Sequence, residues 1–135
     1  MAYTINNGND FLSRFPSHEI TKEVTEETVK FAKDFGHYLG TDGSLKKMTT
    51  TQLRRFFGEV KRQQLQGYNR AQFVLLKPKL AYAVGRDKGK TKIKDFYSVM
   101  SKAIDLVQNE DSFNRFVQVF EAIVAFHKAA EEAGM

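Results

Sequence analysis

Apolar side chains recur at three- and four-residue steps along most of the chain, with charged and polar side chains between them. This spacing is typical of amphipathic helices, and it predicts helices over residues 21–39, 50–64, 69–86, 91–109 and 112–132. The polar segments between these helices are short, and no stretch convincingly predicts a strand. The sequence therefore predicts an all-α, single-domain bundle of about five helices, with residues 21–135 as the domain.

Residues 1–20 do not follow this pattern. They are polar and irregular, and they include Asn6, Asn7, Gly8, Asn9 and Pro16. Chain ends of this composition are often poorly ordered, so we expect a mobile N-terminal arm.

The helix predicted over residues 50–64 separates an apolar face from a basic one. Thr49 followed by Gln52 fits a capping box at its start. An arc of about 100° holds the apolar residues Leu53, Phe56, Phe57 and Val60. Centred roughly 150° away, an arc of about 120° holds the cations Arg54, Arg55, Lys61 and Arg62. A helix that buries its phenylalanines must therefore present these four cations outward.

The helix predicted over residues 69–86 is apolar nearly all the way round, which is typical of a central helix. Pro78 lies inside it, lacks an N–H and should clash with the carbonyl of Val74. The apolar positions stay in helical phase across Pro78, which favours one helix kinked at Pro78 over two separate helices. Three cations lie along its margins: Lys77, Lys79 and Arg86.

The charge is concentrated in the middle of the chain. Residues 45–94 carry fourteen Lys or Arg against two acids, Glu59 and Asp87, for a net +12, while residues 1–44 sum to −3 and residues 95–135 to −4. Clustered cations attract a polyanion. We expect RNA or DNA first, through phosphate contacts that are independent of sequence, and an acidic protein or anionic membrane next. Simple solvated surface is the alternative.

Composition restricts the chemistry further. The chain has 135 residues, 41% of them hydrophobic, and no cysteine, which excludes disulfides, thiolate metal sites and a cysteine nucleophile. No apolar run approaches the ~20 residues that span a bilayer. Residues 1–10 lack the pattern of a signal peptide, so we expect a cytoplasmic protein.

Nothing in the sequence indicates a catalytic or metal site. The segment from Gly85 to Thr91 has three residues between its glycines, where a phosphate-binding loop has four, and it follows a predicted helix. The histidines are His18, His37 and His127; the sequence indicates no catalytic or metal role for them, and a structural role is favoured for His127. The phenylalanine stripes predict core, whereas Tyr68, Tyr82 and Tyr97 could lie at its boundary. We expect no enzyme activity, no metal and no cofactor.

Three blocks of sequence together resemble a known family. They are TTTQLRRFFGEVKR (residues 49–62), LLKPKLAYAVGR (residues 75–86) and FEAIVAFHK (residues 120–128). In order and spacing they are similar to the small helical subunit of type III-A CRISPR–Cas effector complexes, the Csm complexes. The resemblance covers about residue 45 to the end. The small subunit of type III-B complexes is also an α-bundle. The block at residues 75–86, which contains a proline, is the main feature that favours the type III-A subunit over it.

The resemblance implies a non-catalytic subunit present in several copies. Such copies stack as an inner filament beside the backbone subunits that bind the guide RNA, contact the large signalling subunit and support the target RNA paired to the guide. The resemblance does not imply a membrane partner. The RNA-binding residues that it implies are Arg54, Arg55, Lys61, Arg62, Lys77, Lys79 and Arg86. Lys88, Lys90, Lys92 and Lys94 lie outside the blocks and are suggested by charge alone.

Three other interpretations remain. A helix-turn-helix DNA-binding protein would bind one DNA site selectively. A helical adaptor would retain an acidic protein partner but no RNA. An enzyme would show ribonuclease activity that survives repeated purification.

Overall fold

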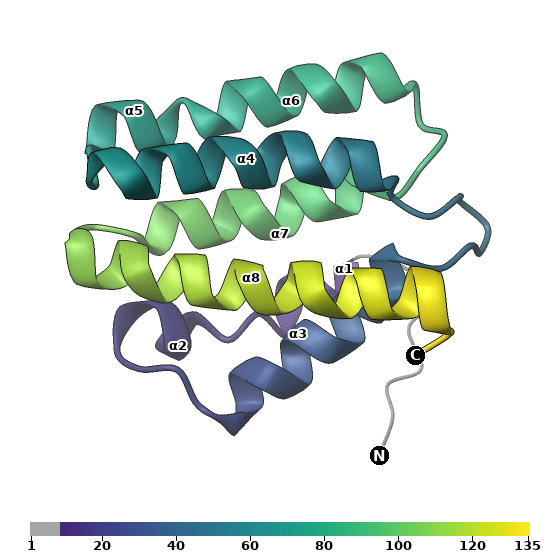
Figure 1. Ribbon diagram of the computed structural model, residues 1–135, viewed down its shortest axis with the longest axis horizontal. Helices are drawn as coiled ribbons and strands as arrows, with labels where there is room; N and C mark the ends of the chain where they lie inside the picture. Colours follow the sequence, from purple (N-terminus) through teal and green to yellow (C-terminus); the bar gives the residue numbers. More distant parts are fainter. Residues whose placement is uncertain (1–8) are drawn as a thin grey trace.

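The computed structural model describes residues 9–135, apart from the side chains of residues 9, 10, 18 and 19. In chain order the helices are α1 (Asn9–Ser13), α2 (Ser17–Thr21), α3 (Glu26–Leu39), α4 (Thr50–Gln66), α5 (Arg70–Val74), α6 (Leu76–Asp87), α7 (Ile93–Leu106) and α8 (Glu110–Ala133) (Figure 1). The part of the chain described contains no strand, only an isolated bridge between Lys46 and Thr91. The predicted all-α bundle is confirmed.

Side-chain caps determine where the long helices begin. At α4 the Thr49 hydroxyl accepts a hydrogen bond from the Gln52 N–H at 3.1 Å, and the Gln52 side chain accepts one from the Thr49 N–H at 2.9 Å, as predicted. α8 begins at Glu110, two residues before the predicted start at residue 112, because Asn109 caps it. α3 begins at Glu26, later than predicted, because Thr25 forms its cap.

α8 runs through the middle of the bundle, with α3 and α2 on one side and α4 and α7 on the other (Figure 1). Glycines allow α3 to approach α8 closely. A β-carbon at Gly36 would lie 2.7 Å from Cβ of Phe126, and one at Gly40 would lie 2.6 Å from the carbonyl oxygen of His127. The buried His127 donates from Nε2 to the Met48 carbonyl at 2.7 Å, which agrees with a structural role.

Aromatic side chains join α4 to the rest of the core. The Phe56 ring packs edge-on against Phe96 of α7 and Phe120 of α8, with ring centroids 5.4 and 5.2 Å away. Leu53 and Val60, on the same face of α4, are also buried. This packing fixes the rotation of α4, and therefore which of its side chains point outward.

The segment around Pro78 differs from the prediction. The chain forms two helices, α5 and α6, that meet at Leu75, so a single helix kinked at Pro78 is not confirmed. Pro78 is the third residue of α6, where its missing N–H needs no intrahelical acceptor. Its ring would clash with the Val74 carbonyl in a continuous helix, and α5 ends at Val74.

Residues 9–20 of the predicted N-terminal arm lie among the described residues, and the mobility of the arm stays a prediction. Phe11 and Ile20 are fully buried, Phe15 is nearly so, and α1 and α2 pack on α7 and α8. α1 and α2 have only five residues each, which is too short for apolar side chains to show a helical stripe. Residues 1–8 of the predicted arm lie outside the described residues, and the domain boundary at residue 20 stays a prediction.

Candidate nucleic-acid interface

The outer face of α4 carries the four predicted cations. Because Leu53, Phe56 and Val60 are buried, Arg54 and Arg55 project away from the core. Both are exposed, and neither forms a hydrogen bond or ion pair with the described residues. These two guanidinium groups are therefore available to an external anion.

Gly58 lies at the centre of this face, three or four residues from each of the four cations. Residues at these spacings are neighbours on a helix surface, so the cations surround a position that has no side chain. On the side toward α8, Lys61 pairs with Glu121 at 3.7 Å. Arg54 is seven residues before Lys61 and lies on the same side of α4. On the side toward α6, Arg55 lines a groove between the two helices, and Arg62 shares the carboxylate of Glu59 with Lys79 of α6.

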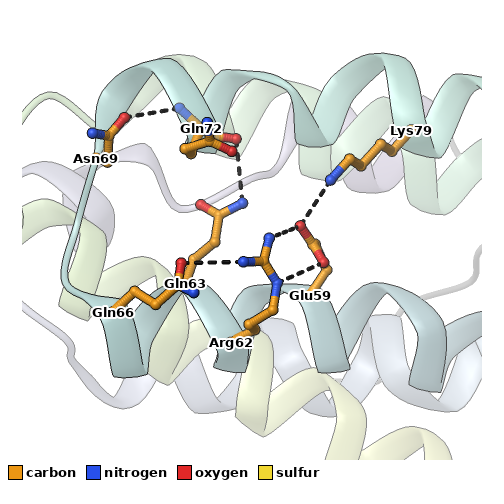
Figure 2. A network of polar contacts seen from close by, with 7 residues as sticks. All are labelled: Glu59, Arg62, Gln63, Gln66, Asn69, Gln72 and Lys79. Carbon is orange, nitrogen blue, oxygen red and sulfur yellow. Dashed lines mark hydrogen bonds and ion pairs between the residues drawn. The ribbon is translucent and has the colours of Figure 1, made fainter.

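Glu59 binds two of the cations, Arg62 of the same helix and Lys79 of α6, and the contact with Lys79 links α4 to α6 (Figure 2). Its carboxylate accepts hydrogen bonds from the Arg62 guanidinium at 2.5 and 3.2 Å, and from Lys79 of α6 at 2.8 Å. Arg62 also donates to Gln66 at 3.1 Å. The hydrogen bonds from Arg62 and Lys79 lower the pKa of Glu59 to about 2, so Glu59 is ionised at neutral pH.

The three predicted cations of α6 point in two directions. Lys79 and Arg86 are seven residues apart and face α4, where both line a groove between the two helices. Lys77 faces the other way and pairs with Asp105 of α7. The structure therefore brings Arg55, Arg62, Lys79 and Arg86 together, places Arg54 and Lys61 on the adjoining side of α4, and separates Lys77 from both.

The groove between α4 and α6 has a volume of about 510 Å³. Phe56 and Leu80, which line it, are buried and form its apolar base. Cations from both helices and from the loop after α6 also line it: Arg55, Lys79, Arg86 and Lys90. The set of RNA-binding residues implied by the resemblance omits Lys90, which charge alone suggested, and Tyr82, although both line the groove. The sequence shows that Tyr82 lies three residues after Lys79 and Lys90 four residues after Arg86. It does not show that α6 packs against α4.

Lys92 shows that charge alone is a poor guide to this surface. It is only 5% exposed, and its ammonium donates to the carbonyls of Tyr38 and Thr41, both at 2.8 Å. It also lies 4.1 Å from the centre of the Tyr38 ring. Burial lowers the pKa of Lys92. This lysine satisfies carbonyls at the end of α3 and is not available to RNA.

Two other kinds of site are absent from the described residues. No three His, Asp or Glu side chains are placed to hold a metal ion within the part of the chain that the structure describes. Among the same residues, no helix is long and apolar enough to cross a membrane.

Comparison with protein families gives one match. The family model described as Csm2 Type III-A matches residues 22–133. This range begins just before α3 and so includes a segment that the resemblance from residue 45 onward did not cover. No curated protein and no solved structure matches the chain.

Proposed function

Because the chain belongs to the Csm2 family and is a small subunit of a type III-A CRISPR complex, we propose that it binds the backbones of guide and target RNA without sequence specificity. The observation that carries this proposal is the exposed cationic surface on α4 and α6. Arg54 and Arg55 lack internal partners among the described residues, and Lys79 and Arg86 lie across the groove from Arg55.

The physical basis is the regular spacing of phosphates along an RNA duplex. A cationic face can bind this line of charge through shape and phosphate contacts without reading base edges. Each contact contributes little, but copies of the subunit stacked along the duplex would add their contributions through avidity. The isolated protein should therefore bind RNA weakly, and its affinity should fall steeply as salt rises.

The rest of the proposal follows from the family. We assign the chain a non-catalytic, cytoplasmic role, in which several copies stack as the inner filament beside the backbone subunits and contact the large signalling subunit. The family match supports association with other subunits of the complex. The filament arrangement and the missing catalytic role are our proposal.

Replacing four cations by alanine tests the RNA-binding face. The variant carries Arg54→Ala, Arg55→Ala, Lys61→Ala and Arg62→Ala. Alanine preserves α4, so the main change is the loss of four charges. We expect weaker retention of target RNA by the assembled complex, and a slope of log affinity against log salt that is shallower by roughly three.

The matched control removes four exposed cations from other surfaces: Arg14, Lys22, Lys30 and Lys33. It lowers the net charge equally but leaves α4 and α6 intact, so its RNA retention should stay near the unmodified level. Equal losses in both variants would mean that only total charge matters. An unchanged retention in the α4 variant would refute the assignment of this face.

A further inference from the structure

The groove between α4 and α6 has one continuous wall from each helix. Residues 52, 55, 56 and 59 line it from α4, and residues 79, 82, 83 and 86 line it from α6. Both sets follow the spacing of a single helix face. Ala83 contributes only a methyl group to its wall, which leaves space above the buried ring of Phe56. The volume of about 510 Å³ is ample for a single nucleotide.

The lining of the groove combines apolar and cationic groups. Phe56, Leu76 and Leu80 are buried at its base. Its two acids already have partners inside the protein. Glu59 accepts from Arg62 and Lys79, while Asp87 accepts from Gln52 at 3.0 Å and from the Thr91 hydroxyl at 2.9 Å. The cations Arg55, Arg86 and Lys90 therefore dominate the charge at the rim.

Tyr82 supplies a flat aromatic surface at the edge of this groove. It is 70% exposed, and the guanidinium of Arg86 lies 6.0 Å from the centre of its ring. Protein sites for unpaired nucleic acid combine aromatic rings, on which bases stack, with cations that contact the phosphates. The groove offers both, together with an apolar base that excludes water from a bound ring.

We propose that this groove receives an unpaired nucleobase of the bound RNA, stacked on Tyr82, with its phosphate held by the cations at the rim. The inference rests on the proposed RNA-binding function and extends it from the backbone to one base. The two sites are continuous, because Arg55, Lys79 and Arg86 belong both to the RNA-binding face and to the groove.

The test compares two single-stranded RNAs of about twelve nucleotides, one intact and one abasic at every position. Each is titrated with the full chain and with Tyr82→Ala. Loss of one stacked base should weaken binding of the intact RNA by roughly five- to a hundredfold. Tyr82→Ala should have no effect on the abasic RNA, because no base remains to stack.

Two further variants make the result specific. Tyr82→Phe keeps the ring and should retain the affinity of the unmodified protein. Leu65→Ala truncates a side chain of α4 that is 90% exposed and lies outside the groove, and it should change neither titration. Tyr82 is exposed, so its replacement leaves the core intact; thermal unfolding followed by circular dichroism verifies this.

The remaining outcomes separate this inference from the proposed function. If Tyr82→Ala and the unmodified protein bind the intact RNA equally, the groove is not a base site, although RNA binding stands. If Tyr82→Ala leaves RNA affinity unchanged but reduces incorporation into the assembled complex, the groove contacts a protein subunit and the inference is overturned. If the unmodified protein binds neither RNA, alone or in the complex, both proposals fail.

Discussion

At the scale of single residues, Glu59 determines how much of the basic surface is free. It is the one acid among the neighbours of Gly58 on α4, and it neutralises part of the charge of Arg62 and Lys79. The contact with Lys79 also links α4 to α6 across the groove. In the RNA-binding function that we propose, Glu59 has two opposing effects, because it stabilises the helix pair and competes with RNA phosphates for the same cations.

Replacing Glu59 by glutamine separates these effects. Glutamine keeps the size of the side chain but removes the charge, so Arg62 and Lys79 become available to phosphate. We expect Glu59→Gln to bind RNA more tightly at low salt, by roughly threefold, in a filter-binding or anisotropy titration. Glu132→Gln, which removes a carboxylate paired with Lys128 at the other end of the chain, is the control. Weaker binding by Glu59→Gln would show instead that Glu59 positions its two partners for RNA.

The stability of the same variant should depend on pH in a defined direction. The pKa of Glu59 is lowered from 4.5 to about 2, so the folded state favours the ionised carboxylate. Its contribution to the free energy of unfolding is therefore complete above pH 4.5 and is lost as pH falls toward 2. Urea unfolding should show the unmodified protein more stable than Glu59→Gln at neutral pH, with the difference shrinking near pH 2. A difference that stays constant over this range would contradict the ion pairs as its source.

At the scale of the helix, Gly58 lowers the stability of α4, so stability does not explain a glycine at this position. Glycine inside a helix costs about 1 kcal/mol relative to alanine, and a β-carbon at Gly58 would meet no atom within 4 Å. A side chain would therefore fit, yet the centre of the four cations is left bare. An open position at this point lets a phosphate backbone approach the helix closely.

Gly58→Gln tests this interpretation because stability and binding should change in opposite directions. The variant should unfold at higher urea concentration, by up to about 1 kcal/mol, while its RNA affinity falls because the longer side chain holds the phosphates away. Gly85→Gln is the control, since Gly85 is an exposed glycine of α6 with equally open surroundings. It should gain stability without losing RNA affinity. Equal RNA affinity in both variants would remove any role for the bare position.

The same scale shows how far the sequence could predict this structure. Apolar periodicity is local, so it located α4, α7 and α8 to within a few residues and gave the outward face of α4 correctly. The direction of Lys77 depends on Asp105, 28 residues away, and the links of Glu59 to Lys79 and of Lys61 to Glu121 are likewise long-range. No local pattern encodes such pairings. The burial of Lys92 and the groove beside Tyr82 escaped prediction for the same reason.

At the scale of the whole molecule, the uneven charge of the sequence becomes two sides of the bundle. The basic middle third forms α4, α5 and α6 along one edge, whereas the acidic first third forms the helices along the opposite edge (Figure 1). A molecule polarised in this way attracts a polyanion mainly to its basic edge, which is the edge that we propose binds RNA. In that proposal, the other surfaces are left for contacts between copies and with other subunits.

Leu65 is the exposed apolar side chain best suited to such a contact between copies. It is 90% exposed one residue before the end of α4, and Leu75, at the junction of α5 and α6, is 46% exposed. Because Leu65 lies outside the core, Leu65→Glu should fold normally, but a charge at a packed interface would oppose stacking. We expect fewer copies per assembled complex by native mass measurement. Thr51→Glu, which adds the same charge at the exposed start of α4, should leave the copy number unchanged. An unaltered copy number in Leu65→Glu would assign the stacking contact to a different surface.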